Sequence, residues 1–269
     1  MDQNEALSPT MKSEVTGSGQ PIVLVPGGLT GWLSWEPHAR RLAENYKVVR
    51  VQLLAVDSGL QNEPLPPNYS VDYETSALTQ ALDQLAVGQA DFAAWSYGAE
   101  VTLNFALNNP HRVRTLTLIE PPAIWVLRSK GPLSPELLEE QRIIQRLGPG
   151  NVSEAQLEWF THFAGFVPSN VDPKTLPQWP GWVKHKQSLR TGDVAYRHED
   201  DIGRVRNFSK PVLLVKGVGS SAFLHQITDI LAAEFPNVRV QTFEGGHAPH
   251  IVSMEPFMKI LNKFLRSGT

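Results

Sequence analysis

The chain lacks several features that would each point to a class of function. It contains no cysteine among its 269 residues, which excludes disulfides, thiolate metal sites and a cysteine nucleophile. No apolar run approaches the roughly 18 residues that a membrane-spanning helix needs. Residues 1–19 are polar and lack the apolar stretch of a secretory signal. We therefore expect a cytoplasmic protein with no membrane partner.

An excess of charge of one sign is also lacking. The 24 basic and 27 acidic residues give a formal net charge of −3, and neither sign forms a long run. Nucleic-acid-binding proteins typically present a basic patch, so we expect no nucleic-acid partner. Hydrophobic residues make up 41% of the chain, which is ample for a buried core. The length favours one core with an insertion over two domains.

The most informative segment is an apolar run that ends at Ser96. Residues 91–95 have the composition of a short buried strand, and residues 97–108 carry apolar side chains at helical spacing. Ser96 would then stand at a strand-to-helix turn, with Ala94 and Gly98 as the small residues that so tight a turn requires. A serine presented in this way is typically a nucleophile. A packing turn built from small residues is the alternative.

Two further segments lie on either side of this serine in the sequence. Residues 21–25 form a continuous β-branched, apolar strand that runs into a glycine-rich loop. Far downstream, another predicted strand is followed by Gly245, Gly246 and His247. Glycines allow backbone N–H groups to approach a developing negative charge, although a glycine pair alone is also typical of an ordinary loop turn.

The glycine loop, the A-x-S-x-G serine and the late histidine occur in an order that resembles the α/β-hydrolase family. The resemblance implies that Ser96 is the nucleophile and His247 its general base. It further implies that the N–H groups of Gly28 and Tyr97 form an oxyanion hole. Pro26 stands where the family often has a histidine, at a position that is structural in the family.

The acidic partner of the histidine departs from the commonest family pattern. The family usually places an aspartate shortly after the strand at residues 211–217, but residues 218–221 contain no carboxylate. Glu120 follows the strand at 114–119, whose carboxyl end would lie beside that of the nucleophile's strand. Some α/β-hydrolases, among them zearalenone lactonases and cofactor-free quinolone dioxygenases, take their acid from this position. We predict Glu120, with a structural salt bridge as the alternative role and Asp229 as a weaker rival acid.

The alternation of strands and helices predicts an α/β fold, with a mostly parallel sheet and helices on both faces. The core comprises residues 21–120 and 211–269. A polar segment, residues 1–20, precedes it, and little before Ile22 resembles a strand. Residues 121–210 interrupt this alternation of strands and helices, and the resemblance implies a helical cap there. We predict cap helices at 134–147, with Gly148 as a stop signal, and at 153–166.

Tryptophans are concentrated in the predicted cap. Four of the seven lie there: Trp125, Trp159, Trp179 and Trp182. We predict that Trp125, Trp179 and Trp182 line an apolar pocket over Ser96 together with Leu29, since ligand sites are mostly apolar. Core packing within the cap is the alternative. The expected partner is a small hydrophobic substrate.

The sequence indicates neither a metal nor a cofactor. His247 and His250 have the spacing of a ligand pair, but no third ligand accompanies them. Gly217 and Gly219 lack the third glycine of a dinucleotide-binding loop.

These observations favour a serine hydrolase that cleaves a carboxylic ester or lactone with a bulky apolar portion. Two alternatives stay open: a cofactor-free dioxygenase acting on a heteroaromatic substrate, and a non-catalytic ligand-binding member of the fold. The oligomeric state also stays open, with a homodimer as one alternative.

Overall fold

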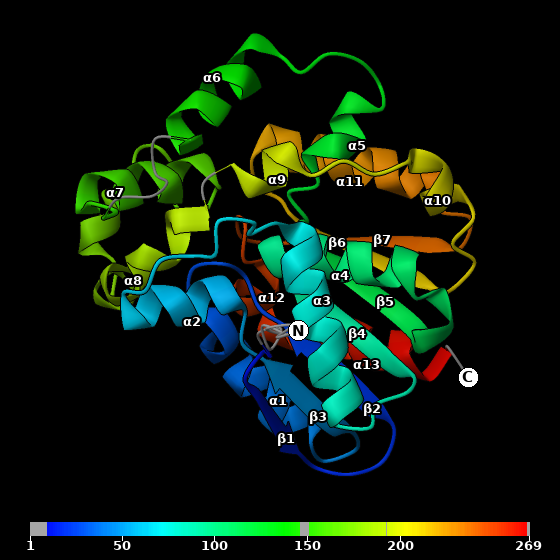
Figure 1. The fold of residues 1–269 in the computed structure, drawn as a ribbon. Helices are drawn as coiled ribbons and strands as arrows, with labels where there is room; N and C mark the ends of the chain where they lie inside the picture. The colour runs from blue at the N-terminus through cyan, green and yellow to red at the C-terminus, as the bar shows by residue number, and fades with distance from the viewer. Residues whose placement is uncertain (1–9, 146–150, 192, 268–269) are drawn as a thin grey trace, which may run out of the picture.

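The computed structural model describes residues 10–145, 151–191 and 193–267. A seven-stranded sheet in the order β1-β3-β2-β4-β5-β6-β7 forms its centre (Figure 1). β1 runs antiparallel to β3, and every other neighbouring pair is parallel. The predicted α/β fold with a mostly parallel sheet is therefore confirmed. The strands are β1 (Ser13–Thr16), β2 (Pro21–Val25), β3 (Lys47–Val51), β4 (Ala90–Trp95), β5 (Val113–Ile119), β6 (Val212–Gly217) and β7 (Val238–Phe243).

Helices cover both faces of the sheet because the central strands are apolar on both sides. Ile22 and Leu24 of β2 belong to a cluster with α1 and α13, whereas Val23 and Val25 pack with α3, α4 and α11. Both faces of a parallel sheet are usually covered in this way. The helices of these layers and their connections are η1 (Gly31–Trp35), α1 (Glu36–Leu42), α2 (Leu54–Gln61), α3 (Val71–Gln84), α4 (Tyr97–Asn108), η2 (Pro110–Arg112), α11 (Ala222–Glu234), α12 (Pro249–Val252) and α13 (Met254–Ser267).

Residues 121–210 form only helices and loops in the part that the structure describes. In Figure 1, α6, α7 and α8 lie to the upper left of the sheet. α7 begins at a capping box, in which Ser153 and Gln156 each satisfy the other's backbone N–H. The predicted end of the first cap helix at residue 147, with Gly148, lies outside the described residues. The elements are α5 (Ile124–Arg128), α6 (Pro135–Gln145), α7 (Glu154–Phe163), η3 (Pro173–Thr175), α8 (Trp179–His185), η4 (Lys186–Thr191), α9 (Val194–Arg197) and α10 (Ile202–Arg206).

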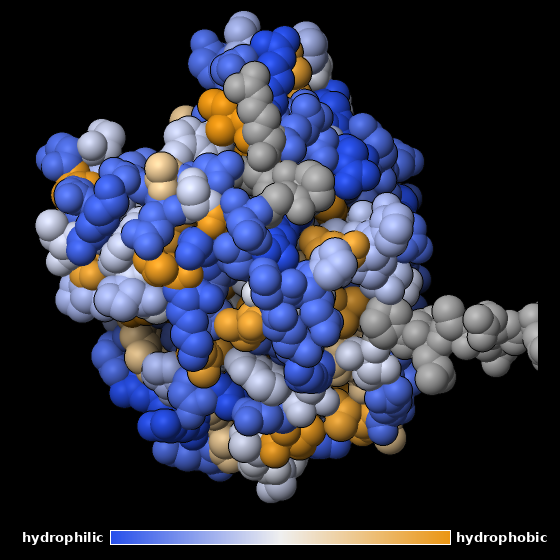
Figure 2. Space-filling view, turned by 60° about the vertical axis from the view of Figure 1, so that its left-hand side comes forward, coloured by the Kyte–Doolittle hydropathy of each residue, from blue (hydrophilic) through white to orange (hydrophobic). Residues whose placement is uncertain are grey.

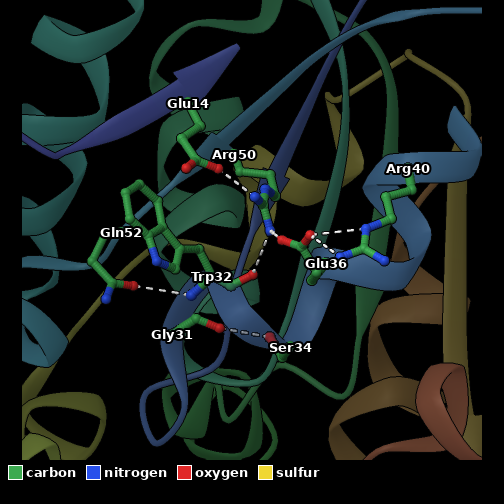
Figure 3. A network of polar contacts seen from close by, with 8 residues as sticks. All are labelled: Glu14, Gly31, Trp32, Ser34, Glu36, Arg40, Arg50 and Gln52. Atoms are coloured by element: carbon green, nitrogen blue, oxygen red, sulfur yellow. Dashed lines mark hydrogen bonds and ion pairs between the residues drawn. The ribbon is translucent and has the colours of Figure 1, made fainter. Parts of the chain in front are cut away.

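The prediction that little before Ile22 forms a strand is wrong. β1 pairs with β3 from Ser13 opposite Val51 to Thr16 opposite Val48. Arg50 of β3, whose side chain is 11% exposed, is paired with Glu14 of β1 and Glu36 of α1 (Figure 3). Most of β1 is exposed, so it carries no apolar alternation. Backbone pairing and a shared arginine hold this edge strand, and neither leaves a hydrophobic pattern in the sequence.

A buried polar network lies behind the start of α4. The carboxylate of Glu74 accepts hydrogen bonds from the backbone N–H groups of Leu54 (3.1 Å) and Ala55 (2.9 Å), the first residues of α2. Tyr69 donates to the same carboxylate at 2.6 Å, and its hydroxyl is hydrogen bonded to that of Tyr97 at 3.1 Å. Burial raises the pKa of both tyrosines well above their usual range. The network joins α2, α3 and α4 beside the candidate site.

The visible surface is mostly hydrophilic. Figure 2 shows hydrophobic residues in small separate groups on one face. Among the residues that the structure describes, no helix combines the length and the apolar character that crossing a bilayer requires.

Candidate active site

Ser96 stands between β4 and α4 in a backbone conformation that few residues adopt. Its φ of 53° and ψ of −131° lie outside the ordinary helical and extended regions. Its N–H donates to the carbonyl of Ile119 on β5 at 2.9 Å. A Cβ at Gly98 would lie 2.1 Å from the carbonyl oxygen of Pro26, so only glycine fits there. The sharp turn exposes the Ser96 side chain at the carboxyl end of the sheet.

His247 reaches Ser96 from the loop that follows β7. Its Nε2 lies 2.7 Å from Ser96 Oγ. The backbone of His247 is held on both sides, since its N–H donates to the carbonyl of Gly165 at 2.9 Å and its carbonyl accepts from Trp95 Nε1 at 2.6 Å. The ring of Phe166 packs edge-on against the imidazole with centroids 5.0 Å apart. The imidazole is therefore fixed in position and almost fully buried.

Glu120 lies against the other nitrogen of this imidazole. Its Oε2 is 2.7 Å from His247 Nδ1, and Glu120 is itself fully buried. The carboxylate also accepts from the backbone N–H of Gly217 at 2.7 Å and from Ser220 Oγ at 2.5 Å. The rival Asp229 instead pairs with Lys216 at 2.6 Å, and its side chain is 63% exposed. The structure thus brings together the serine, the histidine and the glutamate that the sequence singled out.

Sequence reasoning missed the part that Ser220 plays. Ser220 lies in segment 218–221, where the resemblance noted in the sequence implies an aspartate and none is present. In the structure its hydroxyl donates to Glu120. The signal in the sequence was a serine at a position where an acid was expected. Its hydroxyl can donate a hydrogen bond to a carboxylate that comes from another strand.

Gly28 and Tyr97 lie next to each other beside Ser96. A Cβ at Gly28 would be 3.5 Å from Tyr97 Cβ, and one at Gly27 would be 3.3 Å from Ser96 Cβ. The loop after β2 and the first turn of α4 therefore converge at the serine. Tyr97 is also the first residue of α4, and a helix N-terminus favours negative charge nearby.

A buried acid in the first turn of α4 could oppose that effect. Glu100 is 1% exposed, and burial raises its pKa well above the usual range, against the opposing charge of Arg128. Burial thus disfavours a negative charge at Glu100, a charge that would compete with an anion at the N-terminus of α4.

A cavity of about 110 Å³ opens directly onto Ser96 and His247. Its wall combines core residues with residues of segment 121–210. The lining residues from the core are Gly27, Gly28, Leu29, Trp95, Ser96, Tyr97, Phe223, Leu224 and His247. The lining residues from segment 121–210 are Pro122, Ile124, Ile144, Phe160, Phe163, Ala164, Phe166, Ser188, Leu189, Thr191, Ala195 and Tyr196. The wall is therefore largely apolar, and Leu29 lies in it as the sequence predicted.

The wall of this cavity, as far as the structure describes it, does not include Trp125, Trp179 or Trp182, the three tryptophans that the sequence analysis expected there. Trp125 is buried in the large core cluster instead. Trp179 packs in a separate cluster with Leu29 and Leu189, and Trp182 lines a more open groove nearby. The aromatic residues that do line the cavity from this segment include Phe160, Phe163 and Phe166. Amphipathic spacing predicts burial, but it does not tell which buried ring meets a cavity.

His250 does not form a metal pair with His247. It is fully buried, and its ring packs on those of Trp35 and Trp95 with centroids 4.8 Å apart in each case. Burial lowers its pKa well below the usual range. In the described ranges, no group of three or more histidine, aspartate or glutamate residues is arranged to hold a metal ion.

Comparison with known proteins places this geometry in a family. The model of the alpha/beta hydrolase family matches residues 22–259. A 2-hydroxy-6-oxo-2,4-heptadienoate hydrolase of Pseudomonas putida is 33% identical over 106 residues, a match that spans 38% of each chain. The protein named "Putative carbamate hydrolase RutD" of Pseudomonas savastanoi pv. phaseolicola is 26% identical over 93% of this chain and 95% of its own.

Solved structures agree on the fold. The enol-lactonase of Burkholderia xenovorans LB400 superposes with a TM-score of 0.77, covering 95% of this chain and 96% of its own at 17% identity. The sheet order, the strand-to-helix turn at Ser96 and the match over residues 22–259 lead to one conclusion. This chain belongs to the alpha/beta hydrolase family.

Proposed function

We propose that this protein is a serine hydrolase that cleaves a carboxylic ester or lactone through an acyl-enzyme. One observation carries the proposal. Ser96 Oγ, His247 and Glu120 are joined by two hydrogen bonds of 2.7 Å, one to each imidazole nitrogen. This is the arrangement that activates a serine hydroxyl, with the acid fixing the tautomer of its base.

The first half of the reaction forms the acyl-enzyme. Ser96 Oγ attacks the substrate carbonyl carbon, and His247 Nε2 takes the hydroxyl proton. The carbonyl oxygen becomes an oxyanion, which accepts hydrogen bonds from the N–H groups of Gly28 and Tyr97 at the N-terminus of α4. The intermediate then collapses, the bond to the alkoxy oxygen breaks, and His247 returns the proton to this leaving oxygen.

The second half releases the acid. Water attacks the acyl carbon, and its proton passes to His247 Nε2. When the bond to Ser96 breaks, the same proton returns to Oγ. Glu120 stabilises the imidazolium in both halves, and its burial strengthens this interaction.

The cavity supports an apolar substrate. Its volume of about 110 Å³ is on the scale of the roughly 150 Å³ that accommodate one benzene ring in a protein interior. Phe160, Phe163 and Phe166 supply aromatic wall on the side of segment 121–210. The names of the relatives, a heptadienoate hydrolase and a carbamate hydrolase, are compatible with attack on a carbonyl carbon.

Incubation with a fluorophosphonate probe and a substrate panel tests the proposal. The panel holds p-nitrophenyl esters of increasing acyl size and aromatic lactones. We expect covalent labelling of Ser96, located by peptide mass spectrometry, and turnover of at least one apolar ester or lactone. Labelling without turnover, or no labelling, would favour a ligand-binding protein. Oxygen uptake with a heteroaromatic substrate, without hydrolysis, would favour the dioxygenase alternative.

Replacing Gly246 by alanine should lower the rate without touching the three side chains. A Cβ there would lie 1.9 Å from the carbonyl oxygen of Gly165, which accepts the N–H of His247. The loop must move, and a shift of about 1 Å at a reacting group can cost roughly 100-fold. We expect kcat to fall about 10- to 100-fold. Gly88→Ala is the control, since a Cβ there meets nothing within 4 Å. Equal rates for the two variants would contradict the expectation.

A further inference from the structure

Two buried hydroxyl groups stand out in the largely apolar wall of the cavity, which also includes the half-buried Thr191. Ser188 and Tyr196 both line it, and they are 1% and 5% exposed. Neither Ser188 Oγ nor the Tyr196 hydroxyl has a hydrogen-bond partner among the described residues. Because buried polar groups almost always have such a partner, both positions call for an explanation.

The other polar side chains at the site make a useful contrast. Tyr97 also lines the cavity, but its hydroxyl is bonded to Tyr69. Ser96 and His247 are bonded to each other. The unpaired hydroxyls of Ser188 and Tyr196 therefore differ from these neighbours. They lie eight positions apart in one stretch of the chain, on η4 and α9.

Both residues are held in place by their backbone. Ser188 packs directly on α2, since a Cβ at Gly59 would be 2.5 Å from the Ser188 nitrogen. The carbonyl of Tyr196 accepts from Arg128 Nη1 at 2.8 Å. Rigid support of this kind is what a recognition site needs, because a fixed donor loses little freedom when it binds.

Tyr196 stays protonated and can therefore donate. Burial, together with the charge of Glu140 on α6, raises the pKa of Tyr196 well above its usual range. At neutral pH its O–H is available to an acceptor oxygen. The hydroxyl of Ser188 can donate or accept. A ligand oxygen that reaches these groups would supply the partner that they lack among the described residues.

We propose that Ser188 and Tyr196 form a polar subsite that binds a hydroxyl or carbonyl oxygen carried on the apolar part of the substrate. The inference rests on the proposed function for the reaction itself. It narrows the substrate class to esters or lactones whose apolar portion, about one ring in size, bears an oxygen substituent. Unsubstituted apolar esters would fill the cavity but leave both hydroxyls without a partner.

Binding without turnover tests this subsite. Ser96→Ala serves as the background, and calorimetry gives the Kd of methyl phenylacetate and of its 3-hydroxy and 4-hydroxy derivatives. We expect one hydroxylated ester to bind several-fold more tightly than the parent ester. Adding Tyr196→Phe or Ser188→Ala should raise the Kd of that ester by roughly 3- to 10-fold. The affinity for methyl phenylacetate should change by less than about twofold.

A matched control and a stability measurement separate recognition from structure. Tyr73→Phe removes a tyrosine hydroxyl that is not in the cavity wall, and it should leave every Kd unchanged. Tyr196→Phe and Ser188→Ala break no hydrogen bond to the described protein, so their Tm should not fall.

Three results would overturn the subsite: equal binding of all the esters, equal weakening of all of them by Tyr196→Phe, or no measurable binding. Because the binding assay needs no catalysis, failure of the parent enzyme to hydrolyse any ester would count against the proposed function alone.

Discussion

Ser96→Ala should reduce kcat by about 10⁴- to 10⁶-fold while the protein stays folded. The variant removes the oxygen that forms the acyl bond, and His247 then has no hydroxyl to deprotonate. Backbone strain does not change much, because alanine and serine pay a similar cost at a φ of 53°. Progress curves with the best ester of the panel give the rate, and thermal unfolding gives the stability.

Ser129→Ala provides the matched control for this experiment. Ser129 lies on segment 121–210, and its hydroxyl donates to the carbonyl of Val126 at 2.6 Å. Ser129 is not one of the described residues that line the cavity. We expect parental kcat in this variant and no fluorophosphonate labelling in Ser96→Ala. Retention of most of the turnover by Ser96→Ala would contradict the serine mechanism.

The mostly parallel sheet could be predicted from the alternation of strands and helices, and the meeting of Ser96, Glu120 and His247 from the resemblance to the α/β-hydrolase family. Ser96 and Glu120 each come directly after a buried, largely apolar strand, and His247 follows the end of β7 by four residues. Parallel strands bring their carboxyl ends to one edge, so three residues far apart in the sequence converge there. The missing carboxylate at 218–221 then directed attention to Glu120. No distance was needed for that inference.

Other features depend on contacts that leave no periodic signal. β1 is held at the sheet edge by Arg50, which sits between Glu14 and Glu36. The tryptophans of segment 121–210 show the same limit. The abundance of tryptophans led to the prediction of an apolar pocket that they would line, yet Trp125 packs in the core cluster while Phe166 packs against His247. Tertiary packing decides which ring faces the site.

Glu120→Gln should lower kcat by about 10² to 10⁴-fold with little loss of stability. The N–H of Gly217 donates to Oε1, so the glutamine carbonyl oxygen will occupy that place. Its NH₂ group then points at His247 Nδ1 and donates to it. That hydrogen bond favours the tautomer with its proton on Nε2, which cannot accept the proton of Ser96. Asp229→Asn, which removes an exposed carboxylate that pairs with Lys216 and not with His247, is the control.

Ser220→Asp should lower kcat in the parental protein and raise it in the Glu120→Gln variant. This opposite effect is the sharpest test of whether Glu120 is the catalytic acid. Ser220 Oγ lies 2.5 Å from Glu120 Oε2, so an aspartate there sits beside the same histidine. With Glu120 present, two carboxylates repel each other and one donor to Glu120 is lost, so the rate should fall. In Glu120→Gln the new carboxylate supplies the missing charge, and part of the rate should return. Rates of the four proteins form a double-mutant cycle. A fall in both backgrounds, or full activity of Glu120→Gln, would show that Glu120 is not the catalytic acid.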